Sequence, residues 1–431
     1  MFYGWKLLFV FWLVLLVAAA FPLYGGGVMN GYMSADLQLE RSVAGLPMSV
    51  YQFVFGLGAP VVGLIVDRFG IRRTLIGGAL LMAVAASLMA SVVTGGLSAV
   101  LVFGVLLGMG GAAAGGITTQ AGVARWFTRR RALAMAILMS APGFGGFLVA
   151  PLINQVIAAA GSNWRAGWVL TAAVATVAAA IAFFFVREQP SDLGQFADGL
   201  EPQSGSASGA PAKSLRSFIT TEPWTRSDVL KTRAFWCLLV AAFGANMGYT
   251  LYFAVGVLHL QDLGHPRDIG AWAFSIFGIS TLLGKLALGS LGDRYDPRYV
   301  WAATTAAFGV GLTIMSAADQ RAELFTCIVL LGFGFGGGLA SMFAVLSNYY
   351  GSKVFPSIAG LAVAITTCAG AIAPPVAGVL YSDSGSYRTA FISIAVWCFA
   401  GAVLIAFTSR PRRAQPTPAD MKPESSLTGA Q

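Results

Sequence analysis

The chain has 431 residues, of which 57% are hydrophobic and only 10% are charged. A soluble domain carries about 25% charged residues, so these charges are too few to cover a soluble fold of this length. The net charge of +9 would suggest nucleic acid binding in a soluble protein. In a membrane protein, the distribution of the basic residues instead indicates which side of the bilayer each loop faces. We therefore expect an all-α integral membrane protein with no nucleic acid partner.

Apolar stretches of about 20 residues, the length of a bilayer-spanning helix, recur along the chain. They lack the ten-residue alternating pattern of outer-membrane strands, so we expect helices. The sequence predicts twelve transmembrane helices, at residues 7–29, 46–66, 74–94, 98–123, 132–158, 166–186, 233–259, 269–291, 299–318, 324–348, 354–381 and 388–408.

A polar gap divides the twelve spans into two groups of six. The predicted domains are an N-terminal six-helix bundle (1–190), a cytoplasmic linker (191–231), a C-terminal six-helix bundle (232–410) and a disordered cytoplasmic tail (411–431). The centre of the linker, from Ser204 to Lys213, is rich in Ser, Gly and Ala, a composition typical of flexible segments.

Basic residues concentrate on one side of the predicted membrane. With the N-terminus in the cytoplasm, 21 of the 27 Lys and Arg residues fall in cytoplasmic segments and five fall in outer loops. Cytoplasmic loops of membrane proteins carry an excess of Lys and Arg. We therefore expect both termini in the cytoplasm and the protein in the cell inner (cytoplasmic) membrane. The remaining basic residue, Lys285, falls within span eight.

Residues that could carry catalysis or hold a metal ion are scarce. The four cysteines lie in apolar stretches, and the two histidines stand in no cluster with the spacing of metal ligands. The sequence also shows neither paired acidic residues for acid–base catalysis nor a nucleophile with a nearby base. We expect no metal, no cofactor and no enzymatic activity.

The two groups of spans repeat each other. Residues 63–73 (Gly-Leu-Ile-Val-Asp-Arg-Phe-Gly-Ile-Arg-Arg) follow span two, and residues 289–298, with Asp293 and Arg294 at matching places, follow span eight. Further matches occur in the same order, at offsets of 223 to 226 residues. Such ordered matches indicate duplication of a six-helix unit.

This duplication, together with G-x-x-x-D-R-x-G-x-R-R at residues 63–73, resembles the major facilitator superfamily over essentially the whole chain. Within that superfamily, the chain resembles the monocarboxylate and oxalate/formate transporter branch. This resemblance rests on residues 3–6 (Tyr-Gly-Trp-Lys), on Tyr24 with the nearby pair at 27–28 (Gly-Val), and on residues 40–42 (Glu-Arg-Ser). The resemblance implies a twelve-helix fold of two six-helix repeats with a substrate cavity between them at the middle of the membrane.

The resemblance also implies a gate on the cytoplasmic side. In the families that the chain resembles, the segment after span two locks the inner gate and does not touch the substrate. Anchoring at the membrane surface explains the arginines of this segment, but it does not explain Gly63 together with Asp67. The expected gating residues are Gly63, Asp67, Arg68, Arg72, Asp293 and Arg294.

Lys285 is a charged residue within an apolar span. A charge at the bilayer centre costs about 2.5–3.5 kcal/mol or more, so it is a functional candidate unless its side chain reaches an interface. All 18 acidic residues can be assigned outside the spans, which leaves Lys285 without a buried carboxylate partner and favours an anionic substrate. By resemblance, Lys285 stands where the branch has the cation that holds the substrate carboxylate.

Two features depart from that branch. Proton-coupled monocarboxylate carriers have an Asp one turn before the span-eight cation, where this chain has Thr281. The oxalate/formate type has a second cation in span eleven, where this chain has none. Two alternatives follow for how transport is driven. In one, Lys285 itself carries the proton, since burial shifts the pKa of a lysine; in the other, one monocarboxylate is exchanged for another.

Other polar residues inside the predicted spans are candidates to contact the substrate. Tyr24, Asn30 and Gln52 fall where the oxalate/formate type places aromatic and amide contacts. Hydrogen bonding between helices is the competing explanation for each amide. With Lys285, the predicted substrate-binding residues are Tyr24, Asn30, Gln52, Gln120, Asn246 and Tyr249.

The sequence favours a monomeric secondary active transporter that moves a small monocarboxylate by alternating access, either together with a proton or by anion exchange. The alternative is an exporter of an amphipathic organic anion or drug. It is motivated by residues 141–146 (Ala-Pro-Gly-Phe-Gly-Gly), which partly resemble the antiporter motif of drug exporters. A membrane-embedded enzyme or receptor is a third class, which no catalytic cluster or sensor domain in the sequence supports.

Overall fold

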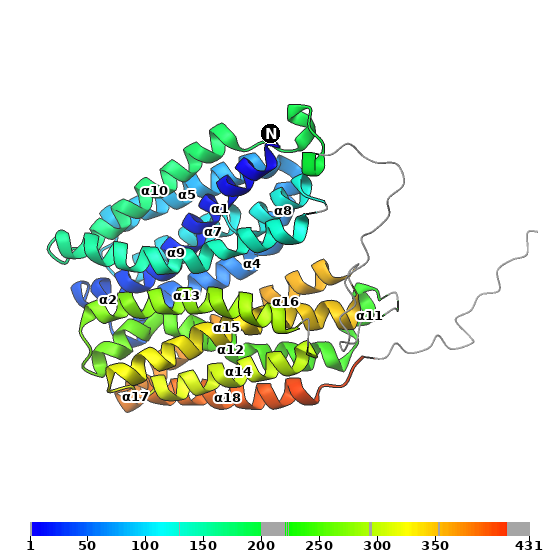
Figure 1. Ribbon diagram of the computed structural model, residues 1–431. Coiled ribbons are helices and arrows are strands. Elements are labelled where there is room, and N and C mark those ends of the chain that lie inside the picture. Colours follow the sequence, from blue (N-terminus) through cyan, green and yellow to red (C-terminus); the bar gives the residue numbers. More distant parts are fainter. Residues whose placement is uncertain are drawn as a thin grey trace, which may run out of the picture.

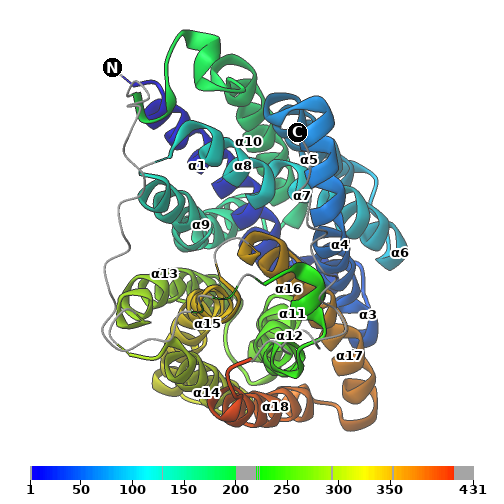
Figure 2. The ribbon, with the colours of Figure 1, turned by 90° about the vertical axis from the view of Figure 1, so that its right-hand side faces the viewer.

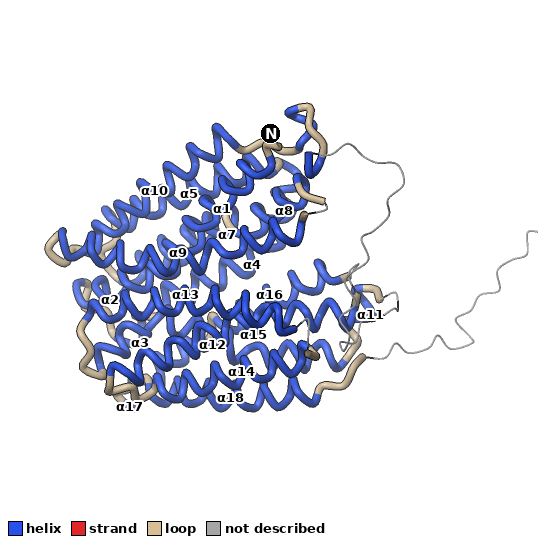
Figure 3. Tube along the Cα trace, in the orientation of Figure 1, coloured by secondary structure: helices blue, strands red, loops and turns tan. Residues whose placement is uncertain are grey.

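All regular secondary structure is helical in the residues that the computed structural model describes, which are 2–128, 130–199, 220, 222, 224–292, 295–351 and 354–411 (Figure 1, Figure 3). Eleven segments of these residues are long and apolar enough to cross a membrane. A further long helix, α14 (Pro297–Met315), packs against α15 and α18. The predicted all-α, twelve-helix membrane fold is confirmed.

The first six spans consist of one to four helical pieces each. Two breaks have local causes. Pro22 has no N–H to donate and lies in the wider π-helical turn η1, and the extended backbone of Gly115 separates α7 from α8. The pieces are α1 (Gly4–Ala20), η1 (Phe21–Gly25), α2 (Gly26–Asp36), α3 (Arg41–Ala44), α4 (Leu46–Phe69), α5 (Ile71–Ser91), α6 (Gly96–Ala99), η2 (Val100–Leu107), α7 (Gly108–Ala114), α8 (Gly116–Trp126), α9 (Arg131–Ala159) and α10 (Trp164–Phe185).

The last six spans are more regular. The one break falls before Pro374 and Pro375, where two consecutive prolines remove backbone donors. The helices are α12 (Arg233–Asp262), α13 (Arg267–Gly292), α14, α15 (Arg321–Tyr350), α16 (Phe355–Gly370), α17 (Ala373–Ser384) and α18 (Arg388–Phe407).

In the described part of the region between the two groups of spans there are three short helices: η3 (Pro190–Leu193), η4 (Ala197–Gly199) and α11 (Arg226–Leu230). The predicted flexible stretch from Ser204 to Lys213 lies outside the described residues, as does the predicted tail (411–431) except for its first residue. The domain boundaries therefore stay predictions.

The two groups of six spans form two halves that lie one above the other in Figure 1. Along their boundary α9 packs against α13, α4 against α16, and α2 against α12. The N-terminus of α1 and the C-terminus of α18 lie at one end of the bundle, which Figure 2 shows facing the viewer. We call this the inner end and the opposite end the outer end, following the predicted topology.

Glycines set the closest helix contacts. A Cβ at Gly332 of α15 would lie 2.6 Å from the backbone oxygen of Phe277 in α13, and one at Gly278 of α13 would lie 2.8 Å from that of Gly143 in α9. Small residues let helix backbones approach closely in membranes, where helices gain little from hydrophobic burial. On the outside of the bundle, apolar side chains such as Leu64 and Leu97 are exposed, as expected of a surface that faces lipid.

Candidate functional site

Lys285 lies on a face of α13 that points towards the first half. Gly278, seven residues earlier and therefore on nearly the same face, packs against the backbone of Gly143 and Phe147 in α9. Lys285 is partly buried. Among the described residues it makes no hydrogen bond and no ion pair. The cation therefore faces the boundary between the halves without a counter-ion from this part of the chain.

A cluster of aromatic rings lies further towards the outer end, where η1, α12, α13 and α15 meet. The ring of Tyr24 contacts that of Phe253 edge-on at 4.9 Å, and Phe253 stacks on Phe274 at 5.0 Å between centroids. Tyr249 stacks on Phe335 at 4.2 Å and lies 4.8 Å from Phe253. The structure thus brings the predicted residues Tyr24 and Tyr249 against one common ring, that of Phe253.

A buried hydroxyl lies between this aromatic cluster and the lysine. Phe274, Thr281 and Lys285 follow one another at spacings of seven and four residues along α13, which sets them on neighbouring faces of the helix. Thr281 is 4% exposed, and its Oγ1 has no hydrogen-bond partner among the described residues. A buried hydroxyl without a partner costs free energy. This position therefore favours a bound group that pairs with it.

The four predicted amide residues lie in different surroundings. Asn30 is fully engaged as a donor, since its Nδ2 donates to the backbone oxygens of Ala44, at 3.0 Å, and Ala254, at 2.8 Å, and so joins the two halves near the outer end. Asn246 donates within its own helix. Gln52 is buried in α4, and Gln120 in α8 is exposed and contacts the sulfur of Met139 at 3.6 Å.

The two halves separate towards the inner end. On α4, Gly56 contacts Thr367 of α16, where a Cβ on the glycine would lie 3.2 Å from the threonine side chain. Two turns further inwards on the same faces are Gly63 of α4 and Gly360 of α16, and a Cβ on either would meet no atom within 4 Å. The helices therefore touch at one level and are apart about 10 Å closer to the inner end.

The predicted gating residues Asp67, Arg68 and Arg72 lie at this inner end. Asp67 is exposed and makes no hydrogen bond or ion pair with a described residue. Arg68 lies over the ring of the next residue, and Arg72 donates to a backbone oxygen of α10 at 2.6 Å. Asp293 and Arg294 lie outside the described residues. In this arrangement none of the described gating residues bonds to the second half.

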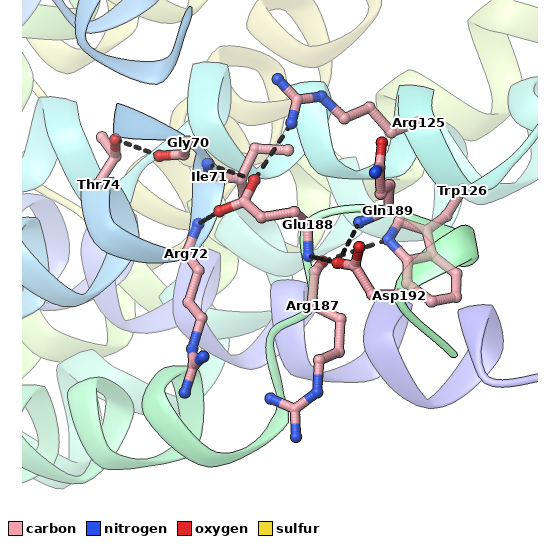
Figure 4. Close-up of polar contacts among 10 residues, drawn as sticks. All are labelled: Gly70, Ile71, Arg72, Thr74, Arg125, Trp126, Arg187, Glu188, Gln189 and Asp192. Carbon is pink, nitrogen blue, oxygen red and sulfur yellow. Dashed lines mark hydrogen bonds and ion pairs between the residues drawn. The ribbon is translucent and has the colours of Figure 1, made fainter. Parts of the chain in front are cut away.

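Glu188 is a structural residue of the inner end that sequence reasoning missed. Its carboxylate accepts hydrogen bonds from the backbone N–H groups of Ile71 and Arg72, at 2.9 and 2.8 Å, and from Arg125 at 3.1 Å (Figure 4). A carboxylate stabilises the N-terminus of a helix, and here it caps α5 directly after Gly70. The sequence shows an acidic residue just beyond span six, but it does not show that this residue caps a helix, because its partner Ile71 lies 117 residues earlier.

A second missed feature joins the halves at the outer end. Arg41 forms an ion pair with Asp262 at 2.7 Å, and its guanidinium lies 5.9 Å over the ring of Tyr381. The hydroxyl of Tyr387 donates to the backbone oxygen of Arg41 at 3.2 Å. Burial raises the pKa of Tyr387, so this phenol stays protonated as a donor. We call Arg41, Asp262, Tyr381 and Tyr387 the outer latch.

The described residues contain no group of three His, Cys, Asp or Glu side chains that could hold a metal ion. The four cysteines, all within described segments, are free. The absence of a metal and a cofactor was expected from the sequence, and it stays an expectation for the chain as a whole.

Comparison with known proteins supplies the family. The model of the Major Facilitator Superfamily matches residues 7–270 and again 251–429. Monocarboxylate transporter 13 of Rattus norvegicus is 27% identical over 366 residues, which cover 83% of this chain and 77% of that protein. Among solved structures, a D-xylose-proton symporter has a TM-score of 0.71 at 15% identity, covering 94% of this chain and 96% of its own. A bacterial homologue of the human lysosomal transporter Spinster, in an inward-facing and occupied conformation, has a TM-score of 0.69 at 14% identity, covering 96% and 98%.

Proposed function

Because this chain belongs to the Major Facilitator Superfamily, in the branch similar to monocarboxylate transporters, and is a multi-pass membrane transporter, we propose that its cargo is a small monocarboxylate anion. The observation that carries the proposal is Lys285, a cation within a membrane span, on the side facing the other half, with no counter-ion among the described residues. An unpaired intramembrane charge is costly, and a bound carboxylate would offset that cost.

The charges of the spans favour a monoanion. Lys285 is the one Lys or Arg that the sequence places away from the ends of a predicted span, and all acidic residues are assigned outside the spans. A lysine is a compact point charge that suits a single carboxylate. Thr281 supports the same assignment, because its buried hydroxyl, which has no partner among the described residues, can donate a hydrogen bond to the second carboxylate oxygen.

The surroundings of Lys285 suggest how the rest of the cargo is held. Tyr24 and Tyr249 belong to the aromatic cluster on the outer side of this site, and such rings suit the apolar part of a small acid. Gln52, Gln120 and Asn246 stay candidates for polar contacts. Asn30 is the weakest candidate, because both hydrogens of its amide are taken by backbone oxygens.

Access would alternate by rocking of the two halves about this site. The halves touch at the outer latch and are apart at Gly63 and Gly360, which supports an arrangement open to the inner end. Closure would bring α4 onto α16, with Gly63, Asp67, Arg68 and Arg72 on one side of the gate. Asp293 and Arg294 stay proposed parts of the same gate.

We propose a monomer in the cell inner membrane with both termini in the cytoplasm, as the distribution of basic residues favours. Coupling is by proton symport or by anion exchange. Thr281 stands where a proton-carrying Asp would be needed, so symport would have to use Lys285 as the group that gains and loses the proton.

The test is uptake of labelled acetate, lactate, pyruvate and benzoate into proteoliposomes, under an inward proton gradient and in exchange with preloaded unlabelled acid. Lys285→Ala and the conservative variant Lys285→Arg are run beside the wild type. We expect saturable uptake that the alanine variant abolishes and the arginine variant partly restores. Uptake that follows the proton gradient indicates symport, and uptake only into preloaded vesicles indicates exchange. No uptake in either mode would overturn the proposal and favour export of an amphipathic anion.

A further inference from the structure

A groove opens on the outside of the first half, separate from the boundary with the second. It lies between α4 and α5 and has α7 as its floor, and its volume is about 550 Å³. Figure 2 shows these three helices grouped on one side of the first half. Its lining is almost wholly apolar and includes the small residues Gly58, Gly77 and Ala112. A Cβ on Gly77 would meet no atom within 4 Å, so space is open there.

One charged residue, Arg73, lines this groove at its inner end. Arg73, Gly77 and Leu81 follow at four-residue spacing along α5, so they form one line up the groove wall. Helical side chains lean towards the N-terminus of their helix, which for α5 is the inner end. Arg73 is exposed and makes no hydrogen bond or ion pair with any described residue. Its guanidinium is therefore free for an anion at the membrane surface.

The lengths of the two groove walls bracket the thickness of one bilayer leaflet. Its lining runs from Arg73 to Leu81 on α5, about 12 Å of helix, and from Phe53 to Phe69 on α4, about 24 Å. Half of the hydrocarbon core is about 15 Å thick. An acyl chain that enters at the level of Arg73 would thus fill the groove to about the middle of the membrane.

We propose that this groove binds an anionic phospholipid of the inner leaflet, with one acyl chain along α4, α5 and α7 and the headgroup phosphate on Arg73. Charge complementarity favours this occupant over a second copy of the chain, whose inner surface is itself rich in arginine. Arginine also forms bidentate hydrogen bonds with phosphate, which favours a phospholipid headgroup at Arg73.

The test is lipid retention by the full-length protein, measured by native mass spectrometry after release from bilayers of phosphatidylglycerol and phosphatidylcholine in equal amounts. Arg73→Gln removes the charge. Its matched control is Arg233→Gln, which removes another exposed arginine at an inner helix end that does not line the groove. Gly77→Leu fills the groove, and Gly77→Ala leaves most of it open.

We expect the wild type to retain phosphatidylglycerol in preference to phosphatidylcholine. Arg73→Gln should lower that preference about fivefold, the effect of one basic residue near an anionic surface, and Arg233→Gln should not. Gly77→Leu should lower retention of the lipid, and Gly77→Ala should not. Equal retention of the two lipids by the wild type, an unchanged preference in Arg73→Gln, or unchanged retention in Gly77→Leu would each overturn the proposal. Loss of a dimer in Gly77→Leu in place of a lipid would also overturn it and assign the groove to a second copy.

Discussion

The outer latch should hold the arrangement in which the halves are apart at the inner end. Arg41 belongs to the first half and Asp262 to the second, and their side chains are 31% and 25% exposed. A partly exposed pair contributes about 1 kcal/mol after screening by solvent. If the pair exists only while the outer end is closed, its loss shifts the ratio of the two arrangements about fivefold towards the outward-open one.

Distances between spin labels measure this shift. Labels at Gln38 and Asp319, both exposed at the outer end of opposite halves, should report a larger outward-open fraction in Arg41→Gln and in Asp262→Asn. The double variant should add little, because both changes break the same pair. The matched control is Arg165→Gln, which removes an outer arginine bonded only within the first half. Unchanged distances in Arg41→Gln, or an equal shift in the control, would refute the reasoning.

Two further predictions concern the inner end. Gly63→Leu should fold, because open space surrounds the glycine, but should block closure of α4 onto α16 and abolish transport. Gly63→Leu should therefore lower the outward-open fraction that the spin labels report. Gly56→Leu should raise that fraction, because the larger side chain would push α4 away from Thr367 of α16. If both variants shift the distances the same way, the assignment of the gate is wrong. Glu188→Gln should lower the free energy of unfolding by about 1 kcal/mol through loss of the cap on α5, seen as a lower melting temperature. Retention of full stability would show that the hydrogen bonds accepted by the Glu188 carboxylate in Figure 4 contribute nothing net.

The positions of the spans could be predicted because apolar length alone marks a bilayer crossing. Residues 166–186 correspond to α10, which is Trp164–Phe185, and residues 299–318 correspond to α14, which is Pro297–Met315. The breaks inside spans were harder to foresee. Nothing in the periodicity around Val100–Leu107 distinguishes the π-helical η2 from an ordinary helix, because that choice depends on packing.

The site stays a prediction, and the sequence indicates only part of its geometry. Lys285 and the pair Tyr24 and Tyr249 stand out by type within apolar spans, and the structure brings the two tyrosines to a common ring. Asn30 also stands out by type, yet its amide bonds to backbone oxygens, one of them 224 residues away. Sequence spacing carries no information about such a partner, since it depends on how the halves meet. The same holds for Glu188, whose role is set by a helix end far back in the chain.

The most direct test of the central claim is equilibrium binding to the purified protein by calorimetry, comparing the best-bound acid of a monocarboxylate panel with its neutral amide. Lys285→Gln is the test variant, and Lys231→Gln, which changes an exposed lysine at the end of α11, is the control. If Lys285 holds the carboxylate, its loss should weaken binding of the acid about ten- to a hundredfold and leave binding of the amide and the control variant unchanged. Equal binding of the acid by wild type and Lys285→Gln would contradict the account.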